Sequence, residues 1–161
     1  MSDPTRTSVL AELAREVRGD TVRFLSAAGE AELTWAPAGT SNHVLWHAGH
    51  SLWLQDALCE RLVTGRSELP AGWEATFGMG SRPRPRGPWP GKREVLGRLV
   101  AQLARVEELL AGIADAALDR TPPHAHPGDD RTLGHCILHG WHDEAKHQGE
   151  MYLLLKMQRL G

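Results

Sequence analysis

Four long segments of this chain repeat apolar residues at steps of three and four positions, the spacing of an amphipathic α-helix. They run over about 5–27, from Ser41 or Asn42 to 63, over 92–116 and over 131–160. No segment alternates apolar and polar residues as a strand does. Helices with one apolar face bury it against one another. The sequence therefore predicts a single all-α domain over residues 1–161, an up-down four-helix bundle.

The ends of these helices carry sequence signals for starting and stopping. The predicted caps and stop signals are Ser41 or Asn42 before the second helix, Gly65 after it, and Asp129 or Asp130 before the fourth. Between the second and third helices, residues 65–91 are rich in glycine, proline and arginine, with four prolines between 83 and 90. Proline lacks the backbone N–H that a helix interior needs, so the prediction here is a long loop.

The overall composition narrows the partners and the compartment. Hydrophobic residues make up 41% and charged residues 24% of the 161 residues, which excludes a disordered chain. A net charge of -2 predicts neither nucleic acid nor an acidic membrane as a partner. Two cysteines, no secretory signal and no apolar run of about 18 residues predict a cytoplasmic protein without a membrane span.

Histidines are concentrated in two short windows. Seven of the nine lie in 43–50 and 135–147. His43, His47 and His50 share one face of the second helix, because they are separated by four and then three positions. On the fourth helix His135, His139, Asp143 and His147 recur every four positions. Bundle cores are where metal sites are built from facing helices.

The spacing decides which of these groups can share an ion. Asp143 and His147 are four apart, so they lie about 40° apart around the helix axis and can bind one metal. His142 and His147 are five apart and diverge by about 140°, so HDEAKH is not the zinc-protease motif, whose histidines are four apart. Spacing alone leaves two interpretations open: metal ligands, or histidines that fill the core or face solvent.

The motifs resemble those of the DinB/YfiT-like superfamily of small metal-binding four-helix bundles. Similar proteins carry a histidine in the middle of helix two, in a context like W-x-x-(A/G)-H. Their last helix carries His, Asp or Glu four positions before a histidine, followed by a polar residue, Gly, and Gln or Glu. This chain has WHAGH at 46–50 and DEAKHQGE at 143–150. The resemblance covers nearly the whole chain, through the number and length of the helices.

The resemblance implies a ligand set of His50, Asp143 and His147. His47 is then a neighbour that supports the site or replaces His50 as a ligand. Asp143 departs from the histidine of many relatives, although thiol-transferase members use a carboxylate there. His139, one turn before Asp143, is expected to be a buried, hydrogen-bonded histidine.

Three protein ligands leave a coordination position open, as catalytic rather than structural sites do. Two nitrogens and one oxygen suit zinc or nickel, and ferrous iron also fits. Two reactions on a small molecule follow: activated water attacks an ester or amide, or a low-molecular-weight thiol attacks an electrophile, as in the S-transferases of the family. No catalytic side chain is assigned. The alternative is a non-catalytic domain that the metal stabilises, whether structural or for interaction.

Other residues carry weaker expectations. The segment 73–90 is predicted either as a substrate lid or as a solvated connector. Its contact residues would be Trp73, Phe77, Met79, Arg82, Arg84, Arg86 and Trp89. Gln55, Glu144 and Glu150 are candidates for orienting water, against the simpler interpretation that such acids are solvated. Cys59 and Cys136 are expected to be buried and unreactive. Six tryptophans predict a homodimer, because aromatic residues are enriched at interfaces.

Overall fold

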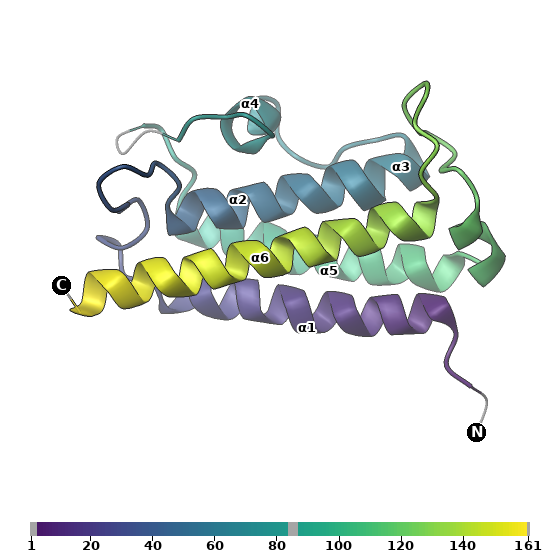
Figure 1. Cartoon of the computed structure of the whole chain (residues 1–161), viewed down its shortest axis with the longest axis horizontal. Coiled ribbons are helices and arrows are strands. Elements are labelled where there is room, and N and C mark those ends of the chain that lie inside the picture. Colours follow the sequence, from purple (N-terminus) through teal and green to yellow (C-terminus); the bar gives the residue numbers. More distant parts are fainter. Residues whose placement is uncertain (1–2, 84–86, 161) are drawn as a thin grey trace.

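The computed structural model describes residues 3–83 and 87–160, and all regular structure in them is helical. Four long helical rods lie side by side along the molecule (Figure 1). The rods are α1 (Arg6–Ala27), α2 (Val44–Gln55) continued through a π turn (Asp56–Glu60) into α3 (Arg61–Thr64), α5 (Lys92–Gly112) and α6 (Leu133–Leu160). The short elements are α4 (Trp73–Phe77) and a 3₁₀ turn (Asp115–Asp119). The all-α prediction is confirmed.

The direction of the helices differs from a simple up-down alternation. The second and third rods run the same way, since Gln102 of α5 binds the carbonyl of Leu52 and Arg105, further along α5, binds Glu60. The connecting segment 65–91 therefore returns along the length of the molecule (Figure 1). It carries the helix α4, which ends before the prolines. This return places α4 over α2, where the histidines lie.

The caps differ from the predicted ones. His43 caps the second helix, because its Nδ1 accepts a hydrogen bond from the backbone N–H of Trp46 at 3.1 Å. Neither Ser41 nor Asn42 holds this position. Gly65 ends the same rod as predicted, in the left-handed conformation with φ 72°.

The fourth long helix is likewise capped by a different residue. Thr132 accepts from the N–H of His135 at 3.2 Å, so it takes the place expected of Asp129 or Asp130. Asp129 instead binds the guanidinium of Arg131. Three candidate oxygens lie close together along the chain here, and only the fold decides which one meets the free N–H groups.

A buried charge cluster joins the rods near the middle of the molecule. Arg18 of α1 binds Glu144 of α6 through two hydrogen bonds of 2.8 and 2.9 Å, and both side chains are almost wholly excluded from solvent. Thr21 and Gln55 donate to the same carboxylate. Gln102 and the carbonyl of Leu99 accept from the guanidinium. A buried ion pair is tolerated when its remaining hydrogen bonds are satisfied, and these are.

All six tryptophans are buried or half-buried within the chain. Their number is therefore explained by packing, and it no longer supports the predicted homodimer. Within residues 3–83 and 87–160, none of the helices has the length and apolar character needed to cross a membrane.

Candidate metal centre

α2 and α6 bring five potential metal-binding side chains together. His47 and His50 come from α2, whereas Asp143, His147 and Glu150 come from α6. Their ligand atoms form two groups of three that share His147. One group is His50, Asp143 and His147, and the other is His47, His147 and Glu150; within each, the atoms lie within 4.8 Å of one another. The structure thus brings together the three predicted ligands and the predicted neighbour His47.

Hydrogen bonds orient the rings of this histidine cluster. Nδ1 of His50 lies 2.6 Å from the carbonyl oxygen of Phe77, an acceptor, so Nδ1 carries the proton and Nε2 keeps a free lone pair. Nε2 of His47 lies 3.1 Å from the carboxylate of Glu150 and donates to it.

The tautomer of His47 then settles that of His147. With its proton on Nε2, His47 has a lone pair on Nδ1, which lies 2.9 Å from Nδ1 of His147. His147 must therefore donate from Nδ1, which leaves its Nε2 free. Metal-binding histidines use one ring nitrogen for the ion and the other for such an anchoring hydrogen bond.

The surroundings keep these imidazoles neutral. Burial lowers the pKa of His47 to about 3 and that of His147 to about 4, helped by the neighbouring histidines. Burial also lowers the pKa of His50. Burial, together with the charge of Asp143, raises the pKa of Glu150. Neutral imidazole is the form that binds a metal, so the cluster offers nitrogen lone pairs at neutral pH.

Aromatic rings close the His50 side of the cluster. Trp46 stacks on His50 at a centroid distance of 4.7 Å and lies edge-on to His147 at 6.0 Å. α4 packs directly over Gly49: a Cβ at this position would lie 2.3 Å from the ring of Phe77. Glycine at position 49 therefore lets the carbonyl of Phe77 reach His50.

The predicted lid segment is largely part of this packing. Trp73 and Phe77 are buried, and Trp73 donates to the carbonyl of Gly49. Trp89 is half-buried against the ring of His43 at 4.6 Å. Of the other expected contact residues in the segment, Met79 and Arg82 are exposed, while Arg84 and Arg86 lie outside the described residues.

A cavity of about 750 Å³ lies on the opposite, His47 side. One wall is the turn before α2, and the other is the C-terminal part of α6. The lining residues are Pro37, Gly39, Thr40, Ser41, Asn42, His47, Glu150, Leu153, Leu154 and Met157. Its size is that of a small-molecule site. None of the described residues that line it belongs to segment 73–90.

Some predicted residues lie elsewhere. His135 and His139 are exposed and stack on one another, so the expectation that His139 is buried is wrong. A step of four residues turns a helix by about 40°, so the row of residues 135, 139, 143 and 147 winds around α6. His139, two turns before His147, therefore points away from the cluster. Glu144 is neither solvated nor able to orient water, because Arg18 holds it. Gln55 is buried beside the same pair.

The cysteines are buried as predicted, and burial raises the pKa of Cys59 to about 12 and also raises that of Cys136. Phe77 was expected only as an apolar contact residue of segment 73–90, and sequence reasoning missed the bond of its backbone carbonyl to His50, which no side-chain pattern reveals.

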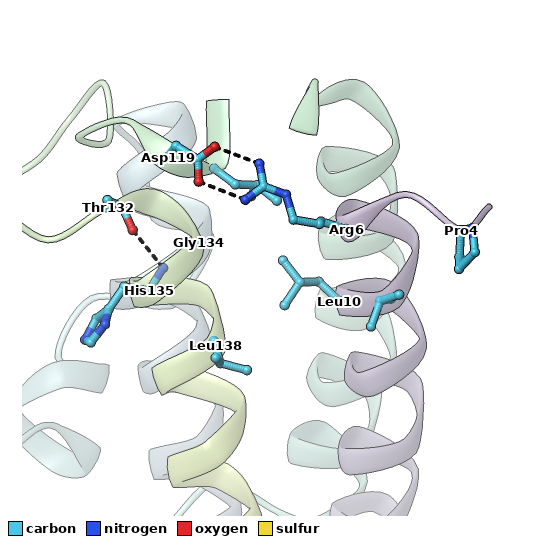
Figure 2. A pocket seen from close by; sticks show the side chains of 10 residues that line it. Pro4, Arg6, Leu10, Asp119, Thr132, Gly134, His135 and Leu138 are labelled. Atoms are coloured by element: carbon cyan, nitrogen blue, oxygen red, sulfur yellow. Dashed lines mark hydrogen bonds and ion pairs between the residues drawn. The ribbon is translucent and has the colours of Figure 1, made fainter. Parts of the chain in front are cut away.

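A second hollow, of about 440 Å³, lies between the starts of α1 and α6 (Figure 2). Arg6 is already bound there by both oxygens of Asp119, at 2.8 Å each. The ring of His135 points away from Arg6 and Leu10 (Figure 2). Neither group of three potential ligands found among the described residues includes a residue of this hollow. The histidine cluster is therefore the better candidate centre.

Comparison with known proteins agrees with the geometry. The family model of the DinB superfamily matches residues 13–151, which include both histidine windows, the two middle rods and most of α1 and α6. A comparison with curated proteins gives no match. The chain belongs to the DinB superfamily.

Proposed function

We propose that this protein binds one divalent metal ion through His50, Asp143 and His147 and uses it as an enzyme on a small molecule. One observation carries the proposal: the hydrogen bonds leave a free Nε2 lone pair on both histidines, and a carboxylate lies within reach of them. Zinc, nickel or ferrous iron suits two nitrogens and one oxygen.

The neighbouring residues hold these ligands in place. Phe77 fixes the ring of His50 through its carbonyl, and Trp46 covers one face of that ring. His47 accepts a hydrogen bond from His147 and donates one to Glu150, so the position of Glu150 helps to orient both rings. Loss of such a supporting hydrogen bond typically lowers metal affinity about 10–100-fold.

The cavity beside His47 supports a catalytic rather than a purely structural centre. A bound ion acts as a Lewis acid that lowers the pKa of a thiol or of water. Thiol transfer to an electrophile and hydrolysis of an ester or amide are therefore the two reactions proposed. The side chain of Glu150 is 59% exposed at the cavity wall, where it can accept a proton or a hydrogen bond from substrate. Both cysteines are excluded as nucleophiles by their burial.

The alternative is a centre that only stabilises the fold. The packing of Trp46 and Phe77 around His50 favours it, because a closed wall is what a structural site needs. The alternative requires a fourth protein ligand in place of an open position. Glu150 and His47 are the candidates for that role, through the second group of three that they form with His147.

The deciding experiment begins with metal analysis of the chain purified without a histidine tag. We expect one ion per wild-type chain and none in His147→Ala. The matched control is His139→Ala, which removes an exposed histidine from the same helix and should keep the full metal content. Full retention by His147→Ala would refute the ligand set. Thiol-conjugation and ester-hydrolysis screens of wild type against His147→Ala then separate an enzyme from a structural centre.

We also propose a homodimer in the cytoplasm. The tryptophans give no support, but large apolar side chains that do not line the cavity are exposed on the last turns of α6, namely Tyr152 and Leu160. Aromatic side chains of this kind are enriched at protein interfaces. Light scattering at micromolar concentration should give a dimer mass, and Tyr152→Glu should lower it to that of a monomer. A monomeric wild type would refute this part of the proposal.

A further inference from the structure

Two of the histidines outside the candidate metal centre form a pair on the surface of α6. His135 and His139 are exposed, and their rings stack with centroids 6.1 Å apart and an angle of 9° between their planes. They are four positions apart, so they lie about one turn apart along the helix and about 40° apart around its axis. Two histidines at this spacing on one helix are the arrangement with which zinc proteases bind one ion. The pair therefore has the spacing of a metal chelate.

The nitrogens of both rings are unused. In the described part of the chain, neither imidazole takes part in a hydrogen bond or an ion pair, and the hydrogen bond from His135 to Thr132 comes from its backbone N–H. The ring of His135 points away from Arg6 and Leu10, out of the neighbouring hollow (Figure 2). Each ring in its neutral form therefore offers a lone pair to solvent.

The positive charges nearest to the pair along the chain are already paired. Arg131, one turn before His135, is bound to Asp129. Lys146, two turns after His139, is bound to Asp143. A cation held by the two rings therefore meets no unpaired positive charge from this stretch of the chain.

We propose that His135 and His139 form a second metal site, a two-histidine chelate on the exposed face of α6 that holds a transition-metal ion in exchange with solution. Neutral imidazole nitrogen is a donor that suits copper, nickel and zinc, with Cu²⁺ bound more tightly than Ni²⁺ or Zn²⁺. Binding requires the stacked rings to turn toward one ion, and their exposure leaves them free to do so. The other coordination positions face solvent, where water or a group of another molecule fills them.

This site differs from the candidate metal centre in affinity and access. The centre offers three ligands, and hydrogen bonds already orient both of its histidines. The surface pair offers two ligands, and the ion itself must order them, which costs binding free energy. The surface ion is therefore held more weakly, and desalting removes it before metal analysis. The expected count of one ion in the purified chain is unchanged, and so is the full metal content expected of His139→Ala.

The test is a calorimetric titration of Ni²⁺ into the desalted wild-type protein at about pH 7.5, where free imidazole is neutral. We expect a weak binding step of one ion, separate from the tight centre. His135→Ala and His139→Ala should each weaken this step at least about tenfold, because the remaining imidazole binds without the effective concentration of its partner. The double variant should lose no more than either single variant, because the two residues act as one chelate.

Two further variants are matched controls. His142→Ala removes an exposed histidine from the same face of α6 and should leave the weak step unchanged. His147→Ala removes a ligand of the candidate centre and should also keep the weak step.

Three results would overturn the inference. They are a wild type without the weak step, losses from the two single variants that add in the double variant, and a loss in His142→Ala as large as that in His135→Ala. This inference does not depend on the proposed function. A centre without metal beside an intact weak step would refute the proposed function alone.

Discussion

Asp143 and Glu144 are neighbours on α6, yet they belong to two polar clusters that use their hydrogen bonds differently. Glu144 is fully buried, and its oxygens accept from Arg18, Thr21 and Gln55. Asp143 is partly exposed, with 22% of its side chain accessible, and accepts from the surface residue Lys146. Consecutive residues of a helix point about 100° apart, so one helix supplies both clusters.

The difference shows what each cluster is suited to do. In the charge cluster, both oxygens of Glu144 and the guanidinium of Arg18 are bound by protein groups, so the cluster is suited to holding the helices together. In the histidine cluster, hydrogen bonds fix the rings but leave lone pairs unused. Unused lone pairs that converge from two helices are what a metal ion requires. Breaking either cluster should therefore give different results.

The largest effect is expected from Glu144→Gln. The variant leaves the guanidinium of Arg18 buried without its counter-charge, which typically costs about 3–5 kcal/mol of folding free energy. Urea denaturation of the metal-free protein measures it. The control is Glu107→Gln, which breaks the exposed pair with Arg15 and should cost at most about 1 kcal/mol. A loss for Glu144→Gln no greater than that of the control would contradict the role of the charge cluster.

Much of this architecture was predictable from the sequence, but the direction in which its polar side chains point was not. Spacing alone placed Asp143 and His147 on one side of a helix, because that is a local property. The same spacing rule also grouped His139 with Asp143 and His147, although the helix has turned away from α2 at that position. Glu144 looked like a solvated acid until Arg18, 126 positions earlier, was placed beside it.

The remaining differences have the same physical origin. The parallel course of α2 and α5 depends on where segment 65–91 returns, which helical periodicity does not encode. The cap of α2 is an imidazole nitrogen of His43, whereas Ser41 and Asn42 are the stronger cap formers by type. Local signals identify the candidates, and packing chooses among them.

Gly49→Ala tests the anchoring of the histidine cluster through α4. The added methyl group would overlap the ring of Phe77, and overpacking of this kind costs about 1–3 kcal/mol. Because the carbonyl of Phe77 then shifts from His50, metal affinity should also fall about 10–100-fold. Calorimetric metal titration and urea denaturation measure both effects.

Gly97→Ala is the matched control for Gly49→Ala. Gly97 lies in α5 with open space around its Cα, so a methyl group meets nothing there. Alanine should raise stability by up to about 1 kcal/mol and leave metal affinity unchanged. If Gly49→Ala behaved in the same way, α4 would not be holding the His50 ring.

His47→Ala sharpens the distinction between a ligand and the residue that orients it. As a supporting residue, His47 holds His147 by one hydrogen bond, so its removal should weaken metal binding about 10–100-fold while one ion per chain still binds at saturation. The measurement is a metal titration with a competing chelator. Complete loss of stoichiometric binding would instead make His47 a ligand, in the group that it forms with His147 and Glu150.

The effect that is smallest at neutral pH concerns acid sensitivity at the edge of the histidine cluster. Burial lowers the pKa of His43 to about 4 from an ordinary value of 6.5. Between these values the unfolded chain carries a proton on His43 that the folded protein does not. Stability from this residue is therefore complete above about pH 6.5 and is lost as the pH falls toward 4, by at most about 1.4 kcal/mol per pH unit.

His43→Asn should flatten this acid dependence. Asparagine can accept the same hydrogen bond from the N–H of Trp46 but does not titrate, so the cap is retained without the proton linkage. Urea denaturation of metal-free wild type and variant across this pH range gives the comparison, and only the slopes matter, because asparagine fills less space. His47 and His147 are present in both proteins, so their own acid dependence cancels in the difference between slopes. Parallel slopes would show that His43 is not protonated on unfolding, and that the acid sensitivity comes from other groups.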